Sequence, residues 1–151
     1  MAVSIDPRLA DLLGHDHDLP PVSPLRFSRE ALLQRFSQAG LISAVISNDH
    51  QHGIETFLTS HGLAHHFQAH WSAEHRPTKP HPDAVHGLCT LLGVPADRCA
   101  LIGDANSDLR MARSAGVPVV LGYRAGWRQP PPLDAWVPQL HHWDELSPGL
   151  D

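Results

Sequence analysis

The sequence predicts an α/β fold, in which a parallel sheet carries helices on both faces. Short apolar runs rich in β-branched residues, such as 41–47 (LISAVIS) and 117–121 (VPVVL), are typical of buried parallel strands. From residue 41 onward, stretches with apolar residues at helical spacing separate these runs. Such an alternation of strand and helix is typical of right-handed crossovers within one parallel sheet.

The first 27 residues stand apart from this pattern. A short helix is expected over residues 6–14, because Asp-Pro is a favourable helix start and Gly a favourable end. Residues 15–27 carry three prolines and no apolar periodicity, which indicates a loop or a junction. We therefore divide the chain into an N-terminal segment, 1–27, and an α/β core, 28–151.

Within the core, most of the expected helices end at a glycine. In chain order we expect a helix from Ser28 to Gly40, a strand over 41–47, a helix over 51–61, a weaker strand over 66–71, a helix from Pro82 to Gly93, a strand over 99–103, a helix over 107–115, a strand over 117–121, and a short strand or helix within 139–146. Phe57 and Leu91 are expected to face inward. Trp127 and Trp136 are expected to anchor the Gly- and Pro-rich stretch 122–138 on the core.

Composition excludes several classes of protein. At 151 residues the chain is expected to form one domain with a sizeable core. No apolar run approaches the roughly 18 residues that span a bilayer, and the first residues lack the pattern of a signal peptide, so we expect no membrane partner and a cytoplasmic location. The formal charge of −5 with scattered Lys and Arg disfavours nucleic acid as a partner.

The cysteines and histidines suggest no defined metal site. Cys89 and Cys99 fit neither a metal knuckle nor a disulfide framework, and we expect both to be buried thiols. The 13 histidines include adjacent pairs such as His65-His66, yet no set has the spacing of a zinc site. We favour surface histidines, with a histidine-rich metal-binding or interaction module as an alternative.

Two carboxylates follow the apolar run at 99–103. Asp104 and Asp108 lie on the expected loop between this strand and the next helix. In open α/β sheets, ligands bind beyond the carboxyl ends of the strands, so this pair is placed where Mg²⁺ could be held. A solvated turn that caps the helix is the alternative interpretation.

Two other polar features fall on the same side of the predicted sheet. Ser47-Asn48 follows one strand, and Lys79 precedes a helix. Ser47 and neighbouring N–H groups can hold phosphoryl oxygens, Lys79 can neutralise their charge, and Asp104 can bind a cation that prefers oxygen. Taken singly, Ser47 is also compatible with an ordinary end of a strand, and Lys79 with a solvated loop.

Three stretches now carry a resemblance to a known family. ISN at 46–48, RPTKPHPDAV at 76–85 and LIGDANSDLRMARSAGV at 101–117 resemble, in order, the second, third and fourth motifs of the haloacid dehalogenase superfamily, and most closely those of its phosphoglycolate-phosphatase-type hydrolases. The resemblance covers about residues 41–123. It implies a Rossmann-like sheet and Mg²⁺-dependent hydrolysis of a small phosphorylated metabolite.

The resemblance also implies roles for particular residues. Ser47 and Lys79 take catalytic positions, and Ser47, Asn48 and Lys79 lie where the family binds substrate. Asp104 takes the metal-binding position, and Asp108 matches the second acidic position of the fourth motif. The substrate itself cannot be read from the sequence, because selectivity in this family depends largely on a cap domain.

The first motif of that family is not evident. It is a strand that ends in Asp-x-Asp, whose first Asp attacks phosphorus. Here the candidate is Asp16-His17-Asp18, which lies ahead of Ser47 at a short spacing and has flanks unlike those of the family. We favour a truncated or degenerate hydrolase core with weak or no turnover. An active capless phosphatase that uses Asp16 and Asp18 is the alternative.

The missing motif also leaves a gap in the expected sheet. In that family the nucleophile strand lies between the strands that correspond to 41–47 and 99–103. Without it, two buried strand edges need another partner. Residues 9–15 could serve, the two strands could pair directly, or the strand and most of the cap could be lost, which we favour. The oligomeric state stays open, although exposed sheet edges favour a homo-oligomer.

Overall fold

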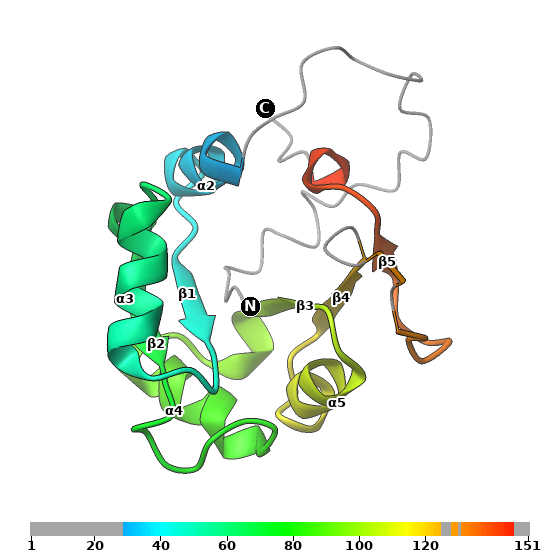
Figure 1. Ribbon diagram of the computed structural model, residues 1–151. Coiled ribbons are helices and arrows are strands. Elements are labelled where there is room, and N and C mark those ends of the chain that lie inside the picture. Colours follow the sequence, from blue (N-terminus) through cyan, green and yellow to red (C-terminus); the bar gives the residue numbers. More distant parts are fainter. Residues whose placement is uncertain (1–28, 125–127, 130, 147–151) are drawn as a thin grey trace.

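The computed structural model describes residues 29–124, 128–129 and 131–146 (Figure 1). It confirms the α/β class, because every strand pair in this part of the chain is parallel. The expected helix over 6–14, the pair Asp16 and Asp18, and Trp127 lie outside the described residues. The division between residues 27 and 28 stays a prediction. None of the helices described is long and apolar enough to cross a membrane.

The elements lie close to where the sequence predicts them. The helices are α2 (Arg29–Gln38), α3 (Gln51–Ser60), α4 (Pro82–Leu92) and α5 (Asn106–Ser114); the strands are β1 (Ser43–Ile46), β2 (Phe67–Trp71), β3 (Ala100–Gly103), β4 (Val119–Tyr123) and β5 (Gln139–Leu140). Short 3₁₀ turns occur at η1 (Ala64–His66), η2 (Ala96–Arg98) and η3 (Trp143–Glu145). The expected tail element thus takes both forms, as β5 and η3. These described residues contain no separate cap domain.

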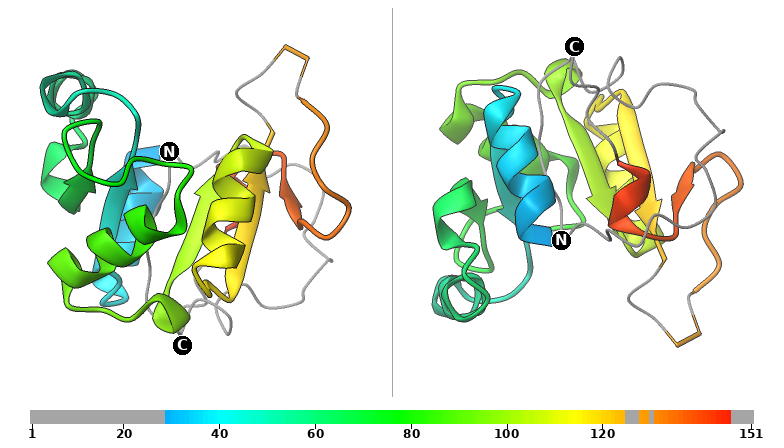
Figure 2. Two further views of the ribbon diagram at one scale, coloured as in Figure 1. Left: turned by 90° about the horizontal axis from the view of Figure 1, so that it is seen from below. Right: turned by 90° about the horizontal axis from the view of Figure 1, so that it is seen from above.

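Hydrogen bonding divides the strands into two groups. β1 pairs with β2, while β3, β4 and β5 form a second group in that order. The two groups lie next to each other, but no pairing joins β1 to β3 among the described residues (Figure 2). Direct pairing of these two strands, one of the three options for the expected gap, is therefore not what the structure shows.

Side-chain packing nevertheless joins the two groups. Ile46 of β1 and Leu101 of β3 belong to one apolar cluster, with α4 and α5 on that face. Val45 and Ile102, their neighbours along each strand, belong to a second cluster with α2 on the other face. Figure 2 shows α4 and α5 in front of the strands in one view, and α2 in the opposite view. Both β1 and β3 are thus buried on both faces, as central strands of parallel sheets are.

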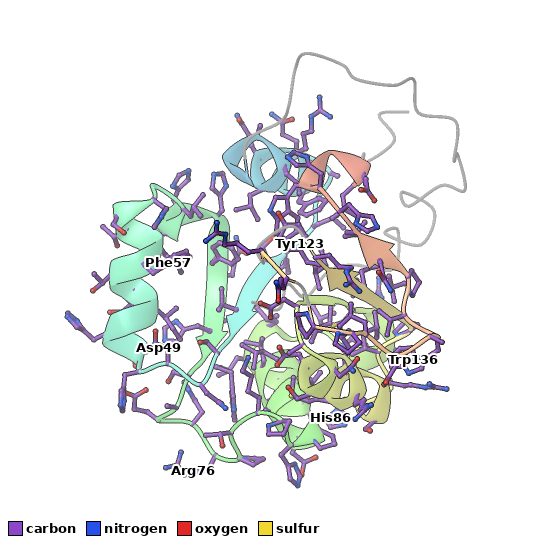
Figure 3. The ribbon with its side chains drawn as sticks, turned by 45° about the vertical axis from the view of Figure 1, so that its right-hand side comes forward. Asp49, Phe57, Arg76, His86, Tyr123 and Trp136 are labelled. Atoms are coloured by element: carbon purple, nitrogen blue, oxygen red, sulfur yellow. The ribbon has the colours of Figure 1, made fainter. Side chains whose placement is uncertain are left out.

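Three expected core residues are exposed instead, and these predictions were wrong. Phe57 is 41% exposed, Leu91 58% and Trp136 37%. On α3 and α4 the buried stripe is narrow and contains Ile54, Leu58, Val85, Leu88 and Cys89. The Arg113 guanidinium carbon lies over the Trp136 ring, 4.5 Å from the ring centre. Trp136 lies on the opposite side of the molecule from Phe57 (Figure 3).

The two cysteines are buried free thiols, as predicted. Their Sγ atoms lie 3.7 Å apart, between α4 and the start of β3. Hydrogen bonding to the Cys99 thiol, followed by burial, raises the pKa of Cys89. A buried thiol in such surroundings stays protonated and packs as a small apolar side chain.

Candidate functional site

Lys79 and Asp108 form an ion pair at the carboxyl ends of the strands. Lys79 Nζ lies 2.9 Å from Asp108 Oδ1. The Asp108 side chain is only 7% exposed and that of Lys79 21%. A buried carboxylate needs a partner to offset its lost hydration, and Lys79 supplies it. The loop after β2 and the first turn of α5 are thereby joined.

The close packing of Asp108 depends on the glycine that ends β3. A Cβ built on Gly103 would lie 3.1 Å from Asp108 Cβ, tighter than ordinary contact. Asp108 also lies in the first turn of α5, where its negative charge complements the helix dipole. The local sequence therefore favours a buried carboxylate at this position.

Asp104 directly follows Gly103 and is partly buried. No group of three or more His, Cys, Asp or Glu side chains within the described part of the chain is placed to hold a metal ion. The two aspartates thus do not form a complete protein cage for a cation. The same finding gives no support to a histidine metal site among those residues.

Ser47 and Asn48 form the turn after β1. The Ser47 N–H donates to Trp71 O at 2.9 Å and continues the pairing with β2. Ser47 Oγ accepts a hydrogen bond from the Asp49 N–H at 3.1 Å. Asn48 Nδ2 donates to the Lys79 carbonyl at 2.9 Å. Contacts thus run from Asn48 through Lys79 to Asp108, with Ser47 one residue before Asn48 and Asp104 four before Asp108.

Further contacts that the sequence analysis missed join the first two loops. The Ala73 N–H, in the loop after β2, donates to Asp49 O at 2.9 Å. Asp49 lies just before the N-terminal end of α3 (Figure 3). Glu74 Oε2 accepts from the Gln51 N–H at 2.9 Å and from Ser72 Oγ at 2.7 Å. These donors, chiefly Ser72, lower the pKa of Glu74 to about 2. The signal in the sequence that could have identified Glu74 was the pair Ser72 and Glu74, a hydroxyl and a carboxylate two positions apart just after a strand.

The loop that carries Lys79 rests on Trp71. Trp71 Nε1 donates to Pro77 O at 2.8 Å, and the His75 ring stacks on the indole with 4.5 Å between ring centres. A Cβ on Gly87 of α4 would overlap the Trp71 ring. Glycine at this position therefore lets α4 pack closely under the indole.

The acidic loop after β3 is held from the other side by residues 131–137. Asn106 Nδ2 donates to Pro132 O at 3.1 Å, and Asn106 Oδ1 accepts from the Asp134 N–H at 2.9 Å. Arg110 binds both oxygens of Asp134 at 2.7 Å. The guanidinium lowers the pKa of Asp134, and the carboxylate raises that of Arg110. Neither Asn106 nor Asp134 was among the expected site residues.

Comparison with known proteins agrees with the motifs. A family model described as haloacid dehalogenase-like hydrolase matches residues 14–121. A phosphoglycolate phosphatase of Thiobacillus denitrificans is 36% identical over 115 residues, which cover 72% of this chain and 50% of the relative. A phosphoglycolate phosphatase of Xanthomonas campestris pv. campestris is 30% identical over 125 residues, with 72% and 56% covered.

A solved structure of a similar protein supports the same family. The crystal structure of a predicted phosphoglycolate phosphatase from Haemophilus somnus 129pt superposes with a TM-score of 0.58 and 29% identity, over 65% of this chain and 44% of that one. The chain spans about half the length of the curated relatives it matches. Since the family model covers well over half of this sequence, the chain belongs to the haloacid dehalogenase-like hydrolases.

Proposed function

We propose that the loops at 47–48, 79 and 104–108 bind the phosphate group of a small phosphorylated metabolite together with Mg²⁺. The observation that carries this proposal is the 2.9 Å contact between Lys79 Nζ and Asp108, with the Lys79 backbone bound by Asn48. This contact supports a lysine ammonium group that is held beside a carboxylate, beyond the ends of parallel strands, where such folds bind ligands. The phosphatase names of the relatives support a phosphate ester as the substrate class.

Each residue has a distinct role in this proposal. The Ser47 hydroxyl donates to a phosphoryl oxygen, and Lys79 neutralises the phosphate charge. Asn48 orients the Lys79 backbone and lines the substrate side of the loop. Asp108 holds the Lys79 ammonium group and adds negative charge near the cation.

The donor set fits Mg²⁺. This ion usually takes one or two carboxylates, several waters and the phosphate itself, so Asp104 with Asp108 nearby suffices. When bound, Mg²⁺ supplies positive charge that stabilises the phosphate oxygens. The protein residues then orient the phosphate through Ser47 and Lys79.

For the chain as given, we propose binding with weak or no turnover. The reason is chemical: the nucleophile motif of the family is not evident in the sequence. One observation favours a second candidate, an active phosphatase that uses Asp16 and Asp18: the matched range begins at residue 14 and so includes this pair. The cytoplasmic location and the homo-oligomer stay predictions from the sequence.

Calorimetry with inorganic phosphate, with and without Mg²⁺, tests the binding proposal. Lys79→Met is expected to weaken phosphate binding about tenfold or more, because it removes a charge-assisted contact. Asp104→Asn is expected to remove the effect of Mg²⁺. Arg98→Met and Asp97→Asn, exposed charges of η2, are matched controls that should change neither. A wild-type chain that binds no phosphate in the presence of Mg²⁺ would overturn the proposal.

A panel of phosphate monoesters with Mg²⁺ separates the two candidates. Weak or absent hydrolysis is expected. Steady turnover that is lost in Asp104→Asn would contradict the degenerate core. Turnover that is also lost in the double variant Asp16→Asn, Asp18→Asn would instead establish the second candidate.

A further inference from the structure

Helix α3 begins beside the proposed phosphate site, and neither its N-cap residue nor an acidic residue of its first turn caps it. Its N-cap residue, His50, makes no side-chain capping hydrogen bond, and its first turn contains no acidic residue. By contrast, His81 caps α4 through Asp83 N, and Asp108 lies in the first turn of α5. The first N–H groups of a helix need acceptors, and the positive end of the helix dipole favours a negative one.

Glu74 supplies that acceptor from another loop. Its Oε2 accepts from the Gln51 N–H at 2.9 Å, the first residue of α3. The same oxygen accepts from Ser72 Oγ at 2.7 Å, and Ser72 is fully buried. Glu74 Oε1 lies 3.1 Å from His50 Nδ1. One carboxylate thus bridges the start of α3 and the loop after β2.

We propose that Glu74 is a positioning residue of the phosphate site: it fixes the turn 47–50 against the loop 72–79, and so sets Ser47 and Asn48 relative to Lys79. This inference rests on the proposed function where it concerns phosphate. The two loops that Glu74 joins are those that carry Ser47 and Lys79. Two further hydrogen bonds join the same loops: the Ala73 N–H donates to Asp49 O, and the Asn48 side chain donates through Nδ2 to Lys79 O.

The chemistry of the contact favours more than a surface ion pair. An exposed ion pair between long side chains contributes little, because both chains lose freedom and water screens the charges. Here the main partners are a backbone N–H and the hydroxyl of a buried serine, which are already fixed. The lowered pKa of Glu74 agrees with an ionised carboxylate that these donors hold at neutral pH.

The test compares Glu74→Ala and Glu74→Gln with the wild-type chain. Glu55→Ala is the matched control, because Glu55 is an exposed glutamate of α3 that accepts a hydrogen bond from the Gln51 side chain and not from the Gln51 N–H. The first measurement is amide hydrogen exchange over residues 47–53. The second is the affinity for inorganic phosphate with Mg²⁺, well below the unfolding temperature. The third is the urea midpoint, which reports global stability.

Glu74→Ala is expected to speed exchange of the Gln51 amide about tenfold and to weaken phosphate binding several-fold. Glu74→Gln, which keeps one acceptor at the same distance along the side chain, is expected to be intermediate in both. Glu55→Ala should match the wild type. Glu74→Gln has the shape of glutamate and carries the test if the alanine variant does not fold.

Three outcomes decide the inference. Unchanged exchange at Gln51 in both variants overturns it. Faster exchange without any loss of phosphate affinity reduces Glu74 to a structural cap, which also overturns it. A wild-type chain that binds no phosphate overturns the proposed function instead, and the exchange result then decides whether Glu74 fixes the turn 47–50.

Discussion

The two groups of strands are organised by separate polar networks. On the β1–β2 side, hydrogen bonds join the turn 47–50 to the loop 72–79, with Glu74 at their centre. On the β3–β5 side, Asn106 and Arg110 bind the segment 131–137. The Lys79–Asp108 pair joins one side to the other at the edge that carries the proposed site. The site thus depends on how these two halves, each with its own polar network, are held together.

Among the described residues, the two halves are joined by the largely buried Lys79–Asp108 pair and by two apolar clusters, each of which contains residues from both halves. Arg110–Asp134, within the second half, has side chains 63% and 23% exposed. Lys79–Asp108, between the halves, has side chains 21% and 7% exposed. Breaking the two ion pairs is therefore expected to change stability by different amounts. Removing one partner of a buried pair leaves an uncompensated buried charge, whereas water hydrates the remaining partner of an exposed pair.

The largest effect is expected where the apolar core joins the halves. Leu88 of α4 is 2% exposed and belongs to the cluster that contains Ile46 and Leu101. Leu88→Ala should lower the free energy of unfolding by about 3–4 kcal/mol, from lost burial and the cavity left behind. Urea unfolding followed by circular dichroism measures this loss.

Leu91→Ala is the matched control on the same helix. Leu91 is 58% exposed, so its truncation should change stability by less than about 0.5 kcal/mol. Equal losses in the two variants would contradict the orientation of α4. A loss confined to Leu88 supports a shared core between the two halves.

A smaller effect is expected from breaking the ion pair between the halves. Lys79→Met leaves the Asp108 carboxylate buried and uncompensated, which should cost about 2–3 kcal/mol in urea unfolding. Asp108→Asn should cost less, because the lysine can reach water. The double variant should then resemble Asp108→Asn alone.

Arg110→Met provides the comparison with the exposed pair. Because the Arg110 guanidinium is well exposed, Arg110→Met is expected to lower the free energy of unfolding by less than Lys79→Met does. If the two methionine variants lose the same stability, burial does not distinguish the two pairs.

The sequence predicted the elements well because their signals are local. The run 41–47 contains β1 at Ser43–Ile46, and the expected helix from Pro82 matches α4. Apolar spacing, Pro at a helix start and Gly at its end act within a few residues. The inward direction of Phe57 and Leu91 was harder to predict, because it depends on what packs against each helix.

Contacts within the site were predicted less well, because they depend on distant parts of the chain. Glu74 and Gln51 are 23 residues apart, and no local pattern pairs them. Asp108 was assigned to a metal together with Asp104, and its contact with Lys79 appears only in the folded chain. The motifs predicted which loops belong together, whereas the partner of each polar atom required the structure.

The smallest effect concerns the network within the β1–β2 half, and acid is the probe. The pKa of Glu74 is lowered from 4.5 to about 2 in the folded chain, chiefly by the Ser72 hydroxyl. Its contribution to stability is therefore fully present above about pH 4.5 and is lost as the pH falls toward 2. Between these values the unfolding temperature of the wild type should fall more steeply than that of Glu74→Gln, which has no charge to lose. Glu55→Gln should keep the wild-type slope, and parallel curves for wild type and Glu74→Gln would show that Glu74 does not stabilise this half through its charge.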